Sequence, residues 1–466
     1  MDGPATSQIP DVLVVGGGSA ALCAAIAARR RGASVRMVER APATLRGGNT
    51  RHARNFRLMH DRPEWYVPDT YSEDSLVRDL ARVTHGATDE KLARVLIRGS
   101  ATIAAWLGDN GVRLQDPANG AMPYSRRTAF FLGGGKAMVN ALYATAIELG
   151  VTVSYDSEVA ALAFGDDRHC EADIVHDGRT ERVAAKALVL CSGGHQANLG
   201  WLRESFGPAA DSFIIRGAPY SDGAILRQLL DAGVKAVGDP VRCHMVAVDA
   251  RGPKFDGGIV TRITAIPHGI VVDRDGQRFH DEGADARKTH FARWGARIAD
   301  CPDQIAYLIL DAKGLDRALP TALAPIRAET IAALATALGL DPAALEATVQ
   351  GFNAATPAAD DSPAIQRGTI GLAPPKSRTA IALTAPPFAA YPMRPGVTFT
   401  HFGVAVDEHM RVVKNDGSAV HNVFAAGMIM AANVLGDGYL AGLGVALSTV
   451  FGRLAGEEAA SCAHAA

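Results

Sequence analysis

Three small residues and one acid have the types and spacing that bind a dinucleotide. Gly16, Gly18 and Ala21 form a GxGxxA pattern, and Glu39 follows 23 residues after Gly16. Gly16 allows a tight turn, Gly18 lets the backbone approach a pyrophosphate, and Ala21 is small enough for a helix to pack closely on a strand. Glu39 is placed to accept hydrogen bonds from a ribose. The pattern predicts a dinucleotide site and leaves FAD and NAD open.

The segment around this pattern supplies the elements that must position it. Val12 to Val15 is an apolar run typical of a strand buried in a parallel sheet. An alanine-rich run compatible with a helix ends at Gly32, and a second apolar strand ends at Glu39. Together they predict a βαβ unit in which the N–H groups at the helix start, at Ser19 and Ala20, face the phosphates.

Bulk composition indicates an ordinary soluble globular protein. The chain has 466 residues, enough for two or three domains, with 48% hydrophobic residues and a net charge of −2. No block of charge suggests a nucleic-acid partner. The six cysteines show no metal-ligand spacing, so we expect no metal site and a reducing compartment. The polar first ten residues and the lack of a long apolar stretch predict a cytoplasmic protein without a signal peptide or transmembrane segment.

Later segments are predicted to extend a doubly wound sheet. Residues 75–110 predict two helices, and the glycines at 133–135 precede a third. Strands are predicted at 151–155, 158–163 and 187–191, the last ending in Ser192-Gly193-Gly194. Ligands bind beyond the carboxyl ends of such strands, so we expect part of the site there. Residues 355–387, rich in Pro and Ala, predict a linker, and the chain then returns through a strand ending at Gly427 to a final helix.

The composition changes near Asp239, and the following part carries most of the polar candidates: Arg242, His244, Thr261, Arg262, His268, His280, Arg287, Lys288 and His290. Taken alone, His244 is more typical of a structural histidine. For Arg262 the alternative to a functional role is a surface arginine. The loop from Gly47 to Thr50 could bring N–H groups and a hydroxyl to a phosphate or a flavin, or form a basic surface loop.

Five stretches, in this order, resemble the fumarate reductase/succinate dehydrogenase flavoprotein family over nearly the whole chain: GGNT (47–50), GGGKAMVNAL (133–142), LCSGG (190–194), VFAAG (423–427) and FGRLAGEEA (451–459). Within the family, the middle of the chain is most similar to tricarballylate dehydrogenases, through GGNTRHARNFR (47–57), VAVDARGPKFDGGIVTR (246–262), RFHDEG (278–283), RPGVTFT (394–400) and GYLAGLG (438–444). The resemblance implies an α/β fold. A Rossmann-like FAD-binding domain would be split into residues 1–240 and 388–466, with an inserted α+β capping domain at 241–387.

The resemblance also implies FAD, bound noncovalently because Asn49 stands where succinate dehydrogenases carry the histidine that bonds to the flavin. The last helix, starting over Gly442 to Val445, would aim N–H groups at the flavin N1/O2 edge and stabilise the anionic reduced form. Met428 replaces the glutamate that usually serves the ribityl chain. The predicted cofactor residues are Gly16, Gly18, Ser19, Ala20, Glu39, Arg40, Gly47, Gly48, Asn49, Thr50, Gly134, Gly135, Val159, Ser192, Gly193, Gly427, Gly442, Leu443 and Gly444.

A substrate site follows from the same resemblance. His244 and Thr261 match family substrate residues. Arg262 replaces the glutamate of fumarate reductases, matches the tricarballylate type, and could hold a carboxylate bidentately. Arg394 is predicted to clamp a second carboxylate. His401 lies on the same strand, where the tricarballylate type tends to carry an aromatic hydroxyl.

The predicted catalytic residues are Arg287, His290 and Tyr439. Arg287 lies near the catalytic arginine of fumarate reductases, offset by about one residue, and His290 or Lys288 are the alternatives as acid/base. Tyr439 replaces the arginine that grips fumarate and resembles the tyrosines near the flavin in steroid dehydrogenases.

These residues predict an FAD-dependent dehydrogenase acting on a CH–CH group beside a carboxylate. A tricarballylate-like polycarboxylate would become its unsaturated acid, by hydride transfer to flavin N5 and proton removal by a base of the capping domain. The alternative is a desaturase or reductase of a ketone, ketosteroid-like, or of a biosynthetic intermediate. A third hypothesis is a flavin subunit that acts only inside a complex. No heme or iron–sulfur cysteine motif is present, which implies a quinone-linked partner or oxygen as electron acceptor.

Overall fold

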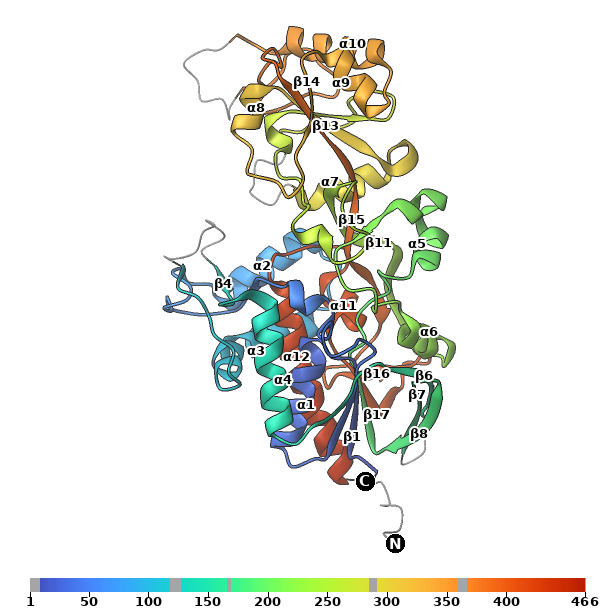
Figure 1. Cartoon of the computed structure of the whole chain (residues 1–466). Helices are drawn as coiled ribbons and strands as arrows, with labels where there is room; N and C mark the ends of the chain where they lie inside the picture. Colours follow the sequence, from blue (N-terminus) through green and yellow to red (C-terminus); the bar gives the residue numbers. More distant parts are fainter. Residues whose placement is uncertain (1–8, 118–126, 166–168, 285–290, 359–366, 466) are drawn as a thin grey trace. The chain divides into compact units, whose positions relative to one another are not determined.

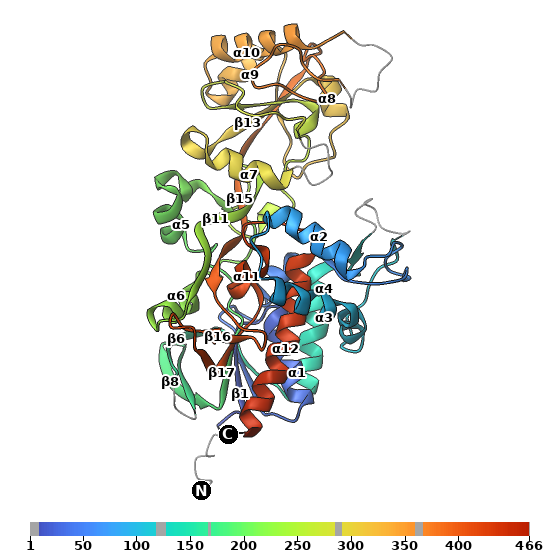
Figure 2. The same cartoon turned by 180° about the vertical axis from the view of Figure 1, so that it is seen from behind.

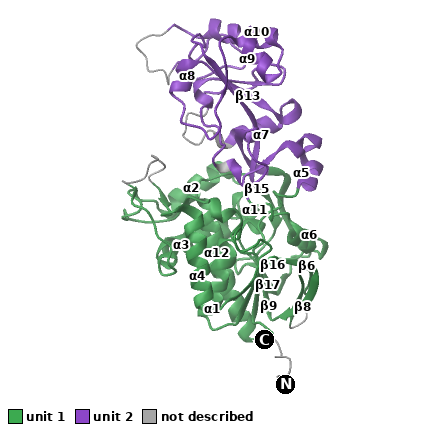
Figure 3. Ribbon diagram, in the orientation of Figure 1, with its two compact units in different colours: residues 1–198, 218–242, 399–466 green, residues 199–217, 243–398 purple. Residues whose placement is uncertain are grey.

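The computed structural model describes residues 9–117, 127–165, 169–284, 291–358 and 367–465. The chain divides into two compact units, which Figure 3 colours separately. Unit 1 comprises residues 1–198, 218–242 and 399–466, and unit 2 comprises residues 199–217 and 243–398.

A six-stranded sheet in the order β16-β17-β9-β1-β2-β5 forms the centre of unit 1. Its strands are β1 (Val12–Val15), β2 (Val35–Val38), β5 (Thr152–Ser154), β9 (Ala187–Leu190), β16 (Arg411–Val413) and β17 (Ala419–Ala425). All neighbours pair in parallel except β16, the antiparallel edge strand. Every residue of β1 and β9 is buried, so these strands are continuous apolar runs, as expected where both faces of a parallel sheet are covered. The predicted α/β fold with a parallel sheet is confirmed.

Helices that include α1 and α12 cover one side of this sheet, and a small three-stranded sheet lies on the other, with α6 beside it (Figures 1 and 2). The helices of unit 1 are α1 (Ser19–Arg30), α2 (Glu73–Thr84), α3 (Glu90–Gly108), α4 (Gly134–Glu148), α6 (Ala224–Asp231), α11 (Ala432–Leu435) and α12 (Leu443–Ala465). Helix α1 packs along α12 at close range: a Cβ on Gly452 or Gly456 would lie 2.4 or 2.1 Å from the carbonyl oxygens of Ala20 and Ala24. Among the described residues, no helix combines the length and the apolar character needed to cross a membrane.

The small sheet corrects one sequence prediction. Residues 158–163 were expected to extend the central sheet, but β6 (Ser157–Ala163) pairs antiparallel with β7 (Cys170–His176), which pairs with β8 (Arg179–Ala185). Buried and partly exposed positions alternate along β7, the pattern of a strand with one covered face. A further pair, β3 (Asn55–Arg57) and β4 (Thr128–Phe130), is also antiparallel.

Unit 2 is built on a second sheet in the order β10-β15-β13-β12, with β11 and β14 also paired to β15. Its strands are β10 (Ile214–Ile215), β11 (Ala236–Asp249), β12 (Ile270–Asp273), β13 (Ala306–Leu310), β14 (Ile326–Ala328) and β15 (Phe388–Val404). The helices are α5 (Leu199–Phe206), α7 (Phe291–Ala299), α8 (Ala312–Asp316), α9 (Ile331–Leu338) and α10 (Pro342–Ala355). Strands β11 and β15 each run from one unit into the other along the chain.

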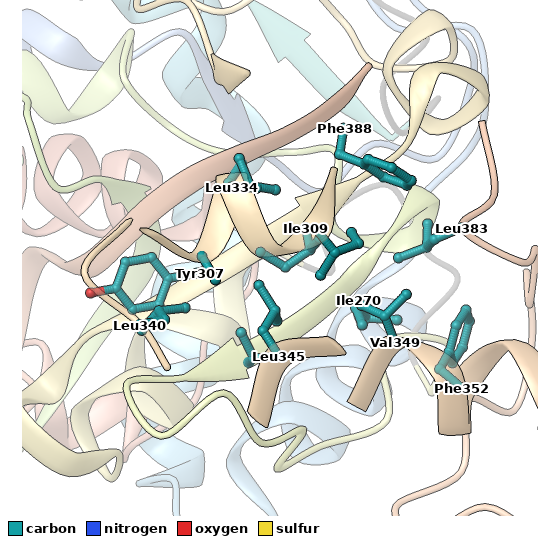
Figure 4. Packing of buried hydrophobic residues seen from close by; sticks show 14 residues of the cluster. Ile270, Tyr307, Ile309, Leu334, Leu340, Leu345, Val349, Phe352, Leu383 and Phe388 are labelled. Atoms are coloured by element: carbon teal, nitrogen blue, oxygen red, sulfur yellow. The ribbon is translucent and has the colours of Figure 1, made fainter. Parts of the chain in front are cut away.

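Helices α9 and α10 cover one face of this sheet. Leu334 of α9 and Leu345, Val349 and Phe352 of α10 pack against β12 and β13, as Figure 4 shows. The predicted linker is wrong for residues 367–387, which belong to unit 2. Lys376 there is 1% exposed, and its Nζ donates to the carbonyls of Pro267 and Gly269 at 2.9 and 2.6 Å.

Candidate active site

A cavity in unit 1 lies beyond the carboxyl ends of β1, β2 and β9, and holds about 960 Å³ of empty space, open solvent included. The predicted cofactor residues that line it are Gly16, Gly18, Ser19, Ala20, Glu39, Arg40, Gly48, Asn49, Thr50, Val159, Ser192, Gly193 and Gly427. The predicted residues that are not among its lining are Gly47, Gly134, Gly135, Gly442, Leu443 and Gly444. The structure thus brings segments from both ends of the chain to one cavity.

Each glycine of the fingerprint is required for a different physical reason. Gly16 has a φ of +115°, and a Cβ there would lie 2.5 Å from the carbonyl oxygen of Cys191. A Cβ on Gly17 would lie 1.9 Å from a carboxylate oxygen of Glu39. Gly18 has an ordinary φ of −78°, and its Cβ would meet only Thr50 Oγ1 at 3.4 Å and Gly47 O at 3.6 Å. The protein itself therefore leaves open the space in front of Gly18, where a pyrophosphate would approach.

A hydroxyl stands at the N-terminus of α1. The backbone N–H of Ser19 donates to Thr50 Oγ1 at 3.0 Å, and the two side-chain oxygens are also 3.0 Å apart. The loop that carries Thr50 forms a short 3₁₀ helix over Gly48–His52. The structure thus places this loop against the helix N-terminus at the cavity, where N–H groups and hydroxyls can bind phosphate oxygens.

Glu39 is buried at the end of β2, 6% exposed. Its Oε1 accepts a hydrogen bond from the Ala41 N–H at 2.8 Å. Burial raises the pKa of Glu39, an effect that the backbone N–H groups of Ala41, Gly47 and Arg40 oppose. Arg40 beside it pairs with Asp222 and, at 3.5 Å, with Glu158. The three acids and the arginine all line the cavity and give it a polar end suited to ribose hydroxyls.

The sequence reasoning missed one further wall of the cavity. Tyr220, Ser221, Asp222 and Gly223 line it, and so does Gln196 after β9. The Asp222 Oδ1 also accepts a hydrogen bond from the Ala224 N–H at 3.1 Å, just before α6. The Ser-Asp-Gly sequence before α6 was the available signal for this wall, but the role of Asp222 at the start of the helix is sufficient to account for it without a ligand.

The cavity residues fit FAD. Ser192 Oγ and Gln196 Oε1 are buried and have no hydrogen-bond partner among the described residues. Polar atoms in this condition normally have a partner in the complete molecule. Together with the open space at Gly18 and the acid at Glu39, they match the polar groups of a dinucleotide.

The first turn of α12 lies next to the cavity. Met428 and Ser448 line the cavity, and a Cβ on Gly444 would lie 3.7 Å from Met428 Sδ. The expected row of unbonded N–H groups is shorter than predicted, because the Leu443 N–H donates to Leu440 O at 3.0 Å. The first hydrogen bond between residues four apart in this helix is that from the Ala446 N–H to Gly442 O. The N–H groups of Gly444 and Val445 lie before this bond, at the N-terminus of the helix.

In unit 2, a face of the sheet gathers two arginines and a histidine. His244, Val246 and Val248 alternate along β11 and therefore share a face. Arg262 pairs directly with Val248 across an antiparallel bridge, so its side chain is on the same face. His244 and Thr261 are each 5% exposed, and the Thr261 hydroxyl donates to Gly257 O at 3.1 Å.

Arg216, which sequence reasoning missed, belongs to this face. A Cβ on Gly396 of β15 would lie 2.5 Å from Val248 Cγ1 and 3.0 Å from Arg216 Cδ. The Arg216 guanidinium donates to Gly258 O at 3.0 Å and to Thr398 Oγ1 at 2.6 Å, and the residue is 6% exposed. We call Arg216, His244, Arg262 and Thr398 the arginine face. The signal for Arg216 was a charged residue closing the apolar run Phe213 to Ile215.

The other predicted substrate and catalytic residues are placed differently. The Arg394 guanidinium donates to the backbone carbonyls of Asp303 and, at 3.2 Å, Gln304, so it binds a turn of unit 2. Burial lowers the pKa of Arg394. Arg287 and His290 lie outside the described residues.

His401 and Tyr439 belong to unit 1, and the aromatic ring of Phe399 lies near both. The Phe399 ring centroid lies 5.1 Å from that of His401 and 6.5 Å from that of Tyr439. His401 is 2% exposed, and burial lowers its pKa to about 4. His401 is therefore neutral at physiological pH, while Tyr439 is partly exposed.

The βαβ fingerprint at the head of a parallel sheet, with a polar cavity at its carboxyl edge, defines a dinucleotide-binding protein. The family model described as FAD binding domain matches residues 11–445. The chain belongs to this family, and its cofactor is FAD.

Known proteins extend the likeness over the whole chain. It is 26% identical over 483 residues to the probable fumarate reductase Ifc3 of Shewanella frigidimarina, covering 97% of this chain and 75% of that protein. It is 28% identical over 364 residues to 4-oxocyclohex-2-ene-1-carboxylate 5-dehydrogenase of Sinomonas cyclohexanicum, covering 71% and 60%. An open flavocytochrome c3 fumarate reductase superposes with a TM-score of 0.78 at 24% identity, covering 98% of this chain and 79% of that one. The protein is an FAD-dependent oxidoreductase of the fumarate reductase type.

Proposed function

We propose that the protein dehydrogenates a CH–CH group next to a carboxylate, with a tricarballylate-like polycarboxylate as substrate. The observation that carries this proposal is the arginine face. Two guanidinium groups, Arg216 and Arg262, and His244 lie on one face of the same sheet. Guanidinium forks match carboxylates in geometry and charge, so two of them suit a substrate with more than one carboxylate.

Different residues serve cofactor binding, carboxylate binding and proton removal in this proposal. FAD, when bound, supplies the acceptor for a hydride. Glu39 and Thr50 would bind its dinucleotide part, and the open space at Gly18 would admit the pyrophosphate. Arg262 and Arg216 hold carboxylates and stabilise the negative charge that develops as the proton leaves the neighbouring carbon. Arg287 stays our predicted base, with His290 or Lys288 as alternatives.

Anaerobic bleaching of the flavin absorbance tests the substrate class. The purified, FAD-loaded protein is mixed with tricarballylate, succinate, citrate or a monocarboxylate of similar length. We expect bleaching with tricarballylate and a much weaker response to the monocarboxylate. A flavin that stays oxidised with every carboxylate would contradict the proposal, provided that dithionite still reduces it.

The aromatic group in unit 1 supports a second candidate, a cyclic ketone. Neutral His401, Phe399 and Tyr439 bring three uncharged rings and one hydroxyl close together, which suits a carbonyl better than a second carboxylate. The relative from Sinomonas cyclohexanicum is named for a substrate with both a ring ketone and a carboxylate. Bleaching by 4-oxocyclohexanecarboxylate but by no polycarboxylate would favour this candidate.

We also propose that a quinone-linked partner or oxygen takes the electrons. Reoxidation of the reduced flavin in air, with and without a soluble quinone, distinguishes the two acceptors. Acceleration by quinone at low oxygen supports a quinone-linked partner, and fast reoxidation in air alone supports oxygen.

A further inference from the structure

Arg57, at the end of β3, holds the two residues that precede α12. Its Nε donates to Ala441 O at 3.0 Å, and its backbone N–H donates to Gly442 O at 3.1 Å. Gly442 O is also the acceptor for the Ala446 N–H at 3.3 Å, the bond with which the ladder of α12 begins. Arg57 therefore fixes both carbonyls that set the direction of the first helical turn.

This contact leaves little freedom to the turn. Gly442 has a φ of +84°, and a Cβ there would lie 2.8 Å from the backbone nitrogen of Arg57. Arg57 itself is 6% exposed. A buried guanidinium that donates to a backbone carbonyl costs free energy to desolvate, so its presence calls for a compensating anion.

Tyr71 and Asp79 provide that compensation. Arg57 Nη1 donates to the Tyr71 hydroxyl at 3.1 Å, which in turn donates to Asp79 Oδ2 at 2.6 Å. Tyr71 is fully buried, and its ring also lies 5.3 Å from the Arg57 guanidinium carbon. Burial raises the pKa of Tyr71 to about 12, so the hydroxyl keeps the proton that this chain of bonds requires.

The turn that Arg57 holds lies next to the cofactor cavity. Gly444, two residues after Gly442, neighbours Met428, and the Ser448 hydroxyl donates to Gly444 O at 2.9 Å. Met428 and Ser448 both line the cavity. The N–H groups of Gly444 and Val445 come before the ladder, and a helix N-terminus stabilises negative charge in front of it.

We propose that Arg57 is a positioning residue for the flavin, which holds the first turn of α12 so that its N–H groups stabilise the reduced, anionic form. The inference rests on FAD binding and on the predicted place of the flavin ring against α12. It does not depend on the proposed substrate. Loss of the hold on Ala441 O should let the turn relax and weaken this stabilisation.

The expected effect is a lower flavin potential. We expect Arg57→Met to bind reduced FAD about tenfold less tightly, relative to oxidised FAD, than the wild type does. For a two-electron couple, this is a decrease of about 30 mV. Tyr71→Phe keeps the ring and loses the hydroxyl, so it should lower the potential in the same direction by less. Arg57→Lys keeps the charge but lacks the fork, and should give an intermediate value.

The midpoint potential of each FAD-loaded variant is measured by dye-equilibrated reduction, without substrate. Affinity for sulfite, which adds to the flavin as an anionic adduct, gives a second readout and should weaken about tenfold in Arg57→Met. Arg62→Met is the matched control, because the Arg62 side chain is 85% exposed, and its potential should equal that of the wild type.

Two results would overturn the proposal. One is an Arg57→Met protein that binds FAD with the potential and the sulfite affinity of the wild type. The other is full recovery by Arg57→Lys, which would assign the effect to charge alone and not to the position of the turn. If Arg57→Met fails to fold, Tyr71→Phe and Arg57→Lys decide, and an unchanged potential in both refutes the role. Failure of every carboxylate as substrate would leave these measurements unaffected.

Discussion

Replacing Gly18 by alanine should separate cofactor binding from folding. At a φ of −78° an alanine fits the backbone, and its Cβ meets Thr50 Oγ1 and Gly47 O at 3.4 and 3.6 Å. The loss of a favourable N-cap residue and the gain from a stiffer unfolded chain are opposite in sign and each below about 1 kcal/mol. The free energy of unfolding of FAD-free Gly18→Ala should therefore stay within about 1 kcal/mol of the wild type.

Binding of FAD should respond very differently. The new methyl group fills the space through which the pyrophosphate reaches the N–H groups at the start of α1. Each hydrogen bond from these groups to a charged phosphate is worth about 1.5–3 kcal/mol. Loss of one such bond raises the Kd for FAD at least about tenfold.

Gly16→Ala is the matched control for the opposite case. Gly16 has a φ of +115°, and an added Cβ would lie 2.5 Å from the Cys191 carbonyl oxygen. The strain therefore arises within the protein and does not depend on FAD. Backbone strain of this kind costs about 1–3 kcal/mol, so the FAD-free protein should already unfold at a lower temperature. Circular dichroism melts and FAD titrations followed by flavin fluorescence measure both quantities. Wild-type FAD affinity in Gly18→Ala, or an apoprotein as unstable as Gly16→Ala, would refute this reasoning.

Other predictions concern single groups. Glu39→Gln should raise the Kd for FAD about tenfold, because a charged acceptor of ribose hydrogen bonds is lost. Burial raises the pKa of Glu39, so wild-type affinity should fall on acidification at a higher pH than an ordinary glutamate would give, and FAD titrations of Glu39→Gln should lack this step. Arg216→Met should raise KM for a carboxylate substrate about tenfold in steady-state assays, whereas Arg394→Met, which loses bonds to a backbone turn, should lower Tm and leave KM nearly unchanged. Lys376 has its pKa lowered by burial from 10.5 to about 8. Between these values the unfolded chain binds a proton that the folded chain does not, so this group makes stability rise with pH there, by about 3 kcal/mol at most. Urea unfolding of Lys376→Met across the window should lack that rise, and an equal slope in both proteins would contradict the assignment.

The fingerprint could be predicted from the sequence because all its parts are local. Strand β1, helix α1 and strand β2 follow one another within residues 12–38, and each has its own pattern of apolar and small residues. The return of Gly427 to the cavity came from a motif match over a long separation. Gln196 and Tyr220 could not be found in this way, because their position depends on the path of the chain after β9 and not on a local pattern.

The limits of unit 2 and its arginine face are also set by tertiary structure. Strands β11 and β15 each pass from one unit to the other within a continuous strand, so the change of composition near Asp239 lies inside β11 and does not mark the end of an element. Arg216 and Arg262 are far apart in sequence, and only the register of β10, β11 and β15 puts them on one face. Proline content misled at residues 367–387, since the same composition suits an extended linker and an irregular segment packed on a core.

The close packing of α1 on α12 has a consequence for biosynthesis. Helix α1 is buried on nearly all sides, and the glycines that let it approach its partner, Gly452 and Gly456, are synthesised long after α1. At typical translation rates of about 5–20 residues per second, α12 is synthesised roughly 20–80 s after α1. The fingerprint is thus synthesised well before the helix that completes its packing, and we expect FAD to be loaded only after α12 has been synthesised.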